Sequence, residues 1–307
     1  MGSPLMFPWF AQANYFGAFI LMVWIILPSL YYTNTWWGQY MPLYSSSLFD
    51  NTGAPYNVTR IVNSDYSFNL TAFKQYSPIM LPPSYALTYA ISFGGIVSLI
   101  THVFLYYRHQ IVRQWKSSLS EIDDIHFKLM QRYKEVPHWW YAATFIVCLT
   151  ASIFTLEYYH TQMRWYGLTV IIIIAGVMFV PVGIITAITN TTPSIFLVCQ
   201  IIAGYMFPGH PVANNLMVTY GYISTTQGMT FAGDLKLGHY MKIPPRTMFT
   251  VQFIGTIIGA FVQIGVLNWL FHNIDGMCTL TAEDGFTCPY AKIHFNGSII
   301  WYIHLIH

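Results

Sequence analysis

Charged residues and cysteines are scarce in this chain. Its 307 residues include 13 basic and 11 acidic side chains, a net charge of +2 and 4 cysteines, so that only 8% of residues are charged. In a typical soluble domain roughly a quarter of the residues are charged. The shortage argues against an ordinary soluble domain, and the small net charge leaves no basic surface for nucleic acid.

The familiar motifs of catalysis and metal binding are also missing. The sequence has no CxxC pair, no HExxH and no P-loop, so zinc hydrolysis and ATP-driven pumping lack their components. The eleven histidines are scattered without the spacing of metal ligands. We therefore expect no metal, no bound cofactor and no enzymatic activity.

What the chain has instead is long apolar runs, in a sequence that is 55% hydrophobic. Five of them cover residues 14–32, 84–107, 139–159, 165–188 and 246–271. At about 1.5 Å of rise per residue, about 20 residues cross the hydrocarbon core of a bilayer. The sequence predicts an all-α, polytopic transmembrane helical bundle with about six to eight membrane segments.

The last apolar run, residues 295–306, is too short to span a membrane. We therefore expect residues 1–307 to be a single membrane domain that forms part of a larger protein.

Basic residues predict the orientation. They concentrate in residues 108–137 and 234–246, which the positive-inside rule places in the cytoplasm. The segments 33–83 and 272–294 are then extracellular or lumenal loops. Asn57 and Asn69 begin N-glycosylation sequons in the first of these loops.

Two cysteines lie in the second lumenal segment. Cys278 and Cys288 are ten residues apart on the expected oxidising side, where a disulfide forms readily, although two free thiols remain the alternative. Cys148 and Cys199 lie within apolar runs and are expected to be packing residues.

The stretch 193–232 is polar for a membrane segment. Because both of its flanks are expected in the cytoplasm, it must enter the membrane and return as a helical hairpin, broken at Pro208–Pro211. The second arm is rich in hydroxyl and amide side chains, among them Asn214, Tyr220, Tyr222, Thr225 and Gln227. Broken helices with polar groups at membrane depth often form the substrate sites of transporters. The alternative is a polar helix held in a bundle by interhelical hydrogen bonds.

Several motifs resemble one known family. LKLGHYMKIPPR at 235–246 and PGHPVANNLMVTYGYISTTQGMTF at 208–231 resemble sequences of the oligopeptide transporter family. YYTNTWW, HWWY and the lumenal C…TCP loop, which begins at Cys278 and ends with Cys288, follow in the family's order. The resemblance covers nearly the whole chain and is closest to the peptide-transporting branch. The chain departs from the family at His210 and in its C-terminal IIWYIHLIH.

The resemblance implies a secondary transporter that carries short peptides into the cytosol together with protons. It also implies a lipid bilayer as the environment, with the plasma membrane as the first expectation and an endomembrane as the second. The alternatives are transport of metal chelates or glutathione conjugates by the same family, or a truncated membrane protein that transports nothing. An integral-membrane enzyme or scaffold that uses the hairpin as its site is a further hypothesis.

The residues themselves suggest roles within such a carrier. A peptide needs hydrogen-bonding partners and a tolerant polar or aromatic wall, which Asn214, Tyr220, Tyr222, Thr225 and Gln227 could supply. Tyr220 and Gln227 are seven apart and share a face of a regular helix.

Proton coupling requires a titratable group near the pathway. Glu157 near the end of an apolar run and His210 at the helix break are the candidates, with an interfacial cap as the alternative for Glu157. Lys236, Lys242 and Arg246 are expected to anchor a cytoplasmic junction at the level of the lipid headgroups, and His239 completes this cytoplasmic signature.

Overall fold

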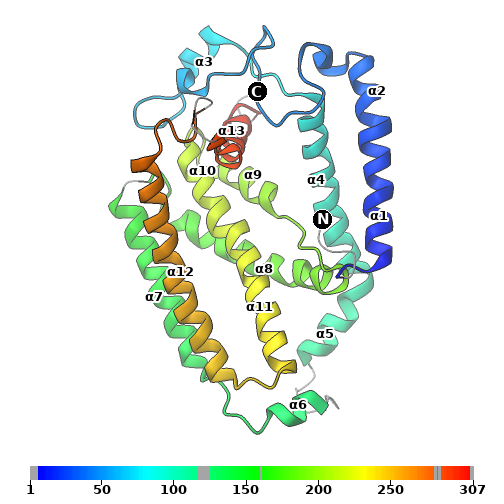
Figure 1. Cartoon of the computed structure of the whole chain (residues 1–307), viewed down its shortest axis with the longest axis vertical. Coiled ribbons are helices and arrows are strands. Elements are labelled where there is room, and N and C mark those ends of the chain that lie inside the picture. The colour runs from blue at the N-terminus through cyan, green and yellow to red at the C-terminus, as the bar shows by residue number, and fades with distance from the viewer. Residues whose placement is uncertain (1–5, 117–124, 160, 280–281, 283–284, 305–307) are drawn as a thin grey trace. The chain divides into compact units, whose positions relative to one another are not determined.

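The described part of the chain is built from helices (Figure 1). The computed structural model describes residues 6–116, 125–159, 161–279, 282 and 285–304. Within these ranges, β structure is limited to isolated bridges in the segment between residues 49 and 80. The predicted all-α class is confirmed.

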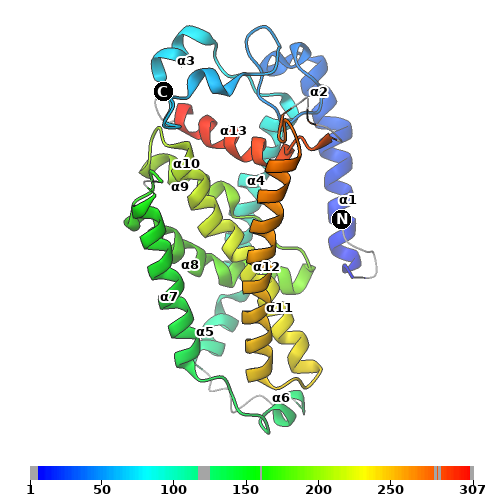
Figure 2. The same cartoon turned by 60° about the vertical axis from the view of Figure 1, so that its left-hand side comes forward.

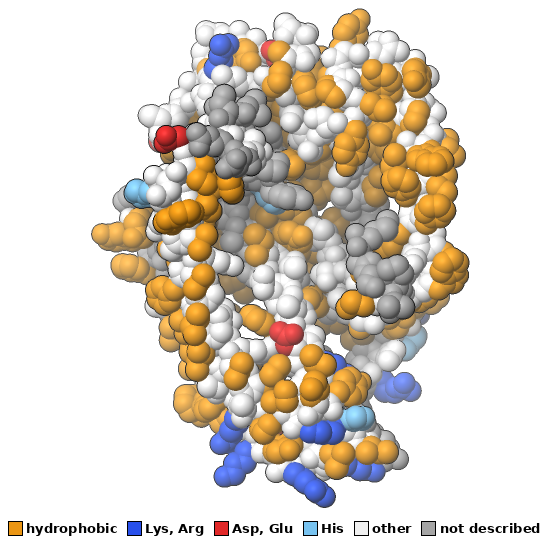
Figure 3. Space-filling view, viewed as in Figure 1, with side chains coloured by type: hydrophobic (Ala, Val, Ile, Leu, Met, Phe, Trp, Pro, Cys, Tyr) orange, Lys and Arg blue, Asp and Glu red, His pale blue; other side chains and the backbone are white. Residues whose placement is uncertain are grey.

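Five helical stretches in the described ranges are long and apolar enough to cross a membrane. They are Trp9–Tyr32, Pro83–Gln114, His138–Tyr158, Trp165–Thr189 and Pro245–Asn273. They coincide with the five apolar runs of the sequence. In no stretch is more than 17% of the most apolar window buried. Apolar side chains therefore face outward, where a lipid bilayer would cover them, and Figure 3 shows many of them on one face of the molecule.

The figure labels divide these stretches further. The first contains α1 (Trp9–Phe19) and α2 (Leu27–Tyr32), and the second begins with α4 (Pro83–His102) and continues into α5 (Arg108–Lys116). The remaining three are α7 (His138–Tyr158), α8 (Trp165–Thr189) and α12 (Pro245–Asn273).

The chain divides into two compact units, which are described separately. One unit contains Met1–Arg108, Leu156–Thr226 and Ile293–His307, and the other contains His109–Thr155 and Gln227–Lys292. Each unit combines segments that lie far apart in the sequence.

The first unit contains the broken hairpin. Helix α9 (Phe196–Met206) ends before Pro208 and Gly209, and Gly209 has a φ of 80°. Helix α10 (Pro211–Val218) begins with a proline, which is tolerated at the first position of a helix. The chain then passes through a π-helical segment, η6 (Thr219–Ile223), into α11 (Ser224–Tyr240). Helices α9 and α10 lie side by side in Figures 1 and 2.

Segment 33–83 of the same unit folds around a small core. Four buried side chains, Leu48, Tyr56, Ile61 and Phe68, form a cluster with Tyr85 of α4 and with Ile299 and Ile300 of α13 (Pro289–His304). The Tyr56 hydroxyl donates to the carbonyl of Ser77 at 3.0 Å, and burial raises the pKa of Tyr56 to about 12. This segment is thus an ordered cap rather than an open connection.

Two short helices in segment 33–83 have asparagine side chains as their N-caps. The Oδ1 atom of Asn69 accepts a hydrogen bond from the backbone N–H of Ala72, which caps α3 (Leu70–Tyr76). Asn57 caps the short turn η3 (Val58–Ile61) in the same way, through the N–H of Thr59.

In the second unit, α12 packs against α7. The ring of Phe249 contacts Trp140 and Tyr141 of α7, with ring centroids 5.5 Å and 5.0 Å apart. Helix α12 begins at Pro245, and a proline is tolerated at the first position of a helix. Cys278 and Cys288 are joined by a disulfide beyond the end of α12.

Candidate functional site

Two buried side-chain amides lie between the arms of the hairpin. Gln200 of α9 is 0% exposed and Asn214 of α10 is 2% exposed. The Nδ2 atom of Asn214 donates to the backbone carbonyl of Gln200 at 3.1 Å, and the indole N–H of Trp301 donates to Gln200 Oε1 at 3.1 Å. Helices α9, α10 and α13 therefore meet at Gln200.

The hairpin concentrates buried polar atoms that have no partner. In the described ranges, five buried side-chain atoms lack one, and three of them belong to the hairpin: Gln200 Nε2, His210 Nδ1 and Asn214 Oδ1. A fourth is the Nδ1 atom of His294 in α13. Leaving such a group unpaired costs roughly 1–3 kcal/mol, so a concentration of them calls for an explanation.

An aromatic cluster lies beside the amides. The ring of Phe196 contacts Tyr222 of η6 at 5.8 Å between centroids and His294 at 4.8 Å. The π-helical turn at Thr219–Ile223 alters the angular spacing of its side chains, and such turns occur frequently at functional sites. Tyr220 lies within this π-helical turn and is half-buried, whereas Gln227 lies in α11 and is exposed.

Thr225 is buried, but its hydroxyl is already occupied. It donates to the carbonyl of Gly221 within the same helix at 2.7 Å. Of the five proposed substrate residues, the structure thus brings Asn214 together with Gln200, places Tyr222 against Phe196 and His294, and engages Thr225 with its own helix. A direct role for each in binding remains a prediction.

Gly221 allows the hairpin to pack closely. A Cβ added there would lie 2.5 Å from the Sγ of Cys199 and 2.7 Å from Cγ1 of Ile171. Only glycine lets η6 approach α9 and α8 at this distance.

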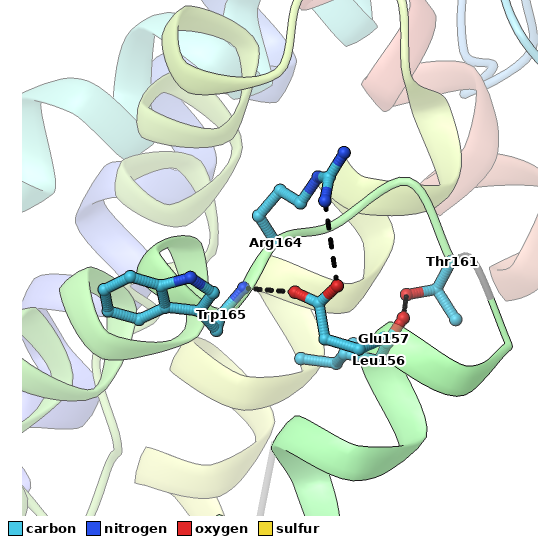
Figure 4. A network of polar contacts seen from close by, with 5 residues as sticks. All are labelled: Leu156, Glu157, Thr161, Arg164 and Trp165. Carbon is cyan, nitrogen blue, oxygen red and sulfur yellow. Dashed lines mark hydrogen bonds and ion pairs between the residues drawn. The ribbon is translucent and has the colours of Figure 1, made fainter.

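Glu157 lies at the end of α7, in the turn that leads to α8 (Figure 4). Its Oε1 accepts from the backbone N–H of Trp165 at 3.3 Å, and its Oε2 lies 3.8 Å from Nη1 of Arg164. These contacts resemble an interfacial cap, since an acidic group is favourable at a helix N-terminus. The side chain of Glu157 is 41% exposed and lines a pocket of about 280 Å³ with Thr161 and Gln162. Its role in proton coupling remains a prediction.

His210 lies at the hairpin break, under the cap formed by segment 33–83. The N–H of Phe68 donates to the carbonyl of Gly209 at 3.0 Å, which fixes the cap to the break. The hydroxyl of Ser67 chiefly holds the pKa of Asp65 below its usual value, and the nearby His210 adds to the effect.

The basic segment, residues 234–246, belongs to the second unit. Its charged side chains contact other parts of the same unit. The Nζ atom of Lys242 lies 2.6 Å from Nδ1 of His126, and Nε of Arg246 donates to the carbonyl of Glu135 at 3.0 Å. Lys236 lies over the ring of Tyr240. These contacts connect α6 (Ile125–Met130) and the segment after it to the turn between α11 and α12. Anchoring at the lipid headgroups remains a prediction.

The remaining sequence candidates lie as follows. His239 contacts the rings of His126 and Tyr240. Asn57 is exposed and Asn69 is half-buried. No group of three or more His, Cys, Asp or Glu that could hold a metal occurs among the residues that the structure describes.

Comparison with known proteins identifies the family. Residues 1–306 match the family model described as OPT oligopeptide transporter protein. The chain belongs to this oligopeptide transporter family. As the sequence motifs predicted, the match covers nearly the whole chain. The chain is an integral membrane protein, as the family and its apolar helices show.

Several curated relatives are transporters by name. Glutathione transporter 1 of Schizosaccharomyces pombe is 44% identical over 97% of this chain. Oligopeptide transporter 7 of Arabidopsis thaliana and Oligopeptide transporter 1 of Saccharomyces cerevisiae are each 40% identical over 98% of it. The chain covers 35%, 40% and 38% of these three relatives, in that order. No solved structure matches it.

Reasoning from the oligopeptide transporter motifs missed Gln200, Trp301 and His294. One signal was available for Gln200, because it is the single amide in the otherwise apolar sequence FLVCQIIAGYM. Nothing in the sequence alone connects it with Trp301, which is 101 residues away.

Proposed function

We propose that this chain forms the substrate-handling part of a transporter that carries short peptides across a membrane. The observation that carries the proposal is the broken hairpin, whose buried polar atoms lack partners within the described protein. In a bilayer no bulk water satisfies such groups, so a polar cargo is the natural partner. The oligopeptide transporters of related sequence support peptides as that cargo.

We further propose proton coupling through His210 and Glu157, with uptake directed into the cytosol at the plasma membrane. His210 lies at the break of the hairpin with a buried, unpartnered Nδ1. Glu157 lies at an open pocket, where a carboxylate can exchange protons with water. No bound cofactor is needed beyond the coupling protons.

A second cargo class is supported by one specific relative. The 44% identical fission-yeast protein is named as a glutathione transporter, so glutathione or its conjugates are the alternative substrate. Glutathione also presents amide groups, and the same hairpin could bind it.

The test is uptake by cells that lack peptide transport and that express the full reading frame encoding this chain. We expect labelled tetra- or pentapeptide to accumulate, and a protonophore to abolish the accumulation. Unlabelled glutathione added in excess distinguishes the two cargo classes. Absence of uptake for every peptide and for glutathione, with the protein present at the cell surface, would contradict transport.

A further inference from the structure

The two hairpin amides have fixed orientations. Trp301 donates to Oε1 of Gln200, so Nε2 must face away from the indole; Asn214 donates through Nδ2, so Oδ1 remains free. Exchanging the oxygen and nitrogen positions of either amide would break the hydrogen bond that it makes. The pair therefore presents one free donor, Gln200 Nε2, and one free acceptor, Asn214 Oδ1.

A donor and an acceptor on residues that contact each other across α9 and α10 match the main-chain groups of one residue in an extended peptide. In an extended chain the N–H and C=O of a single residue point to the same edge, as they do when two antiparallel strands pair. Gln200 Nε2 can donate to that carbonyl, and Asn214 Oδ1 can accept from that N–H. Peptide-binding domains use the same main-chain hydrogen bonds when a peptide adds to a sheet edge.

We propose that Gln200 and Asn214 form a subsite that binds the main-chain N–H and C=O of one cargo residue. This inference rests on the proposed peptide transport and specifies what that transport recognises. Because cargo side chains point away from the bonded edge, the subsite accepts peptides of varied sequence. Ligands without a free peptide N–H at this position bind less well.

Helix α13 controls access to the subsite. A Cβ added to Gly297 would lie 2.8 Å from Gln200 Nε2 and 3.2 Å from the hydroxyl of Tyr89. The backbone of α13 therefore lies directly against the free donor, and Gln200 has no exposed surface. Cargo reaches the pair only when α13 moves away from α9, which also releases Trp301 from Gln200 Oε1. The orientation of Asn214 does not depend on α13, because its Nδ2 atom is held by the Gln200 carbonyl of α9.

The experiment replaces single peptide bonds of the cargo by esters, which removes one N–H and keeps the shape. Initial uptake of a labelled tetrapeptide and of its ester analogues is measured in cells expressing the full reading frame. In the wild type we expect an ester at one position to slow uptake about tenfold, the effect of one lost hydrogen bond that leaves a buried acceptor unpaired.

Two variants at the same site should differ in whether they still discriminate between the amide and the ester. Asn214→Leu removes the acceptor, so its uptake is slower but the amide and the ester are transported at nearly equal rates. Gln200→Met also slows uptake, yet it keeps the discrimination, because the carbonyl that Gln200 binds is present in both compounds. Thr186→Val is the control, since this hydroxyl binds the carbonyl of Val182 within α8; it should leave both rates unchanged.

The outcomes separate the two proposals. If the wild type takes up peptides but no ester position matters, or if Asn214→Leu keeps full discrimination, the subsite is wrong and peptide transport stands. If the wild type takes up no peptide, peptide transport itself fails. Cell-surface biotinylation reports the amount of each variant, and Asn214→Ala replaces Asn214→Leu if that variant does not reach the surface. The wild-type ester scan alone can overturn the subsite.

Discussion

The hairpin and the basic junction at residues 234–246 use their polar groups in opposite ways. At the junction, Lys242 and Arg246 make hydrogen bonds to other parts of the protein. In the hairpin, Gln200 and Asn214 are more deeply buried, yet each keeps an unpartnered atom. Polar groups that the protein itself satisfies serve structure, whereas buried groups left unpartnered are the better candidates for binding.

The largest expected effect comes from breaking the hairpin's packing. In Gly221→Val the added side chain would meet Cys199 and Ile171 at less than 3 Å, so η6 could not remain against α8 and α9. We expect a loss of about 3 kcal/mol or more and little protein at the cell surface. Quantitative surface labelling measures the result.

The control for this variant is Gly259→Val in α12, where nothing in the described structure lies within 4 Å of an added Cβ. It should reach the surface in nearly normal amount. Equal surface levels for the two variants would contradict the close packing of η6.

Gly255, Gly259 and Gly265 also show what the sequence could not decide. These glycines suggest a close helix contact by their spacing, but an added Cβ meets nothing among the described residues at any of the three. Gly221 looks less conspicuous in the sequence and yet has the tight contacts. Which glycine is needed depends on tertiary packing and not on spacing alone.

The same distinction applies to the polar residues. The apolar runs were sufficient to predict the five spans, because these depend on local composition. The break at Pro208 and Gly209 is also local, whereas the return of the chain was inferred from the basic residues on both flanks. Sequence reasoning gave Thr225 the same role as Asn214. The structure separates them, since the Thr225 hydroxyl bonds its own helix whereas Asn214 keeps a free oxygen.

A moderate effect is expected at the junction. Lys242→Met removes the Nζ atom that bonds His126 and the carbonyl of His239 near the C-terminus of α11. We expect a loss of about 1 kcal/mol, because a cation near a helix C-terminus is favourable and the group is half-buried. Surface amount or thermal stability in detergent should fall slightly.

Peptide affinity distinguishes this variant from one in the hairpin. The KM for peptide uptake should be unchanged in Lys242→Met and raised in Asn214→Leu. A raised KM in Lys242→Met at a normal surface level would assign substrate contact to the junction and remove the contrast between the two regions.

The smallest expected effect concerns Asp50 in the cap formed by segment 33–83. Its Oδ1 accepts hydrogen bonds from the hydroxyl and N–H of Thr52 and from the N–H of Ala54, and the Thr52 hydroxyl chiefly holds the pKa of Asp50 below its usual value. A lowered pKa in the folded state means that the carboxylate contributes stability above the unfolded value of 3.8, and that this contribution is lost as the pH falls through the folded pKa. Thermal melts of the detergent-solubilised protein between pH 6 and about pH 3 should therefore show a steeper loss of stability in the wild type than in Asp50→Asn, whose amide cannot titrate. Because Asp50 is only half-buried, the difference should be small. Identical slopes would show that the turn does not depend on this charge, and that the cap, like the hairpin, contains a polar group without a structural role.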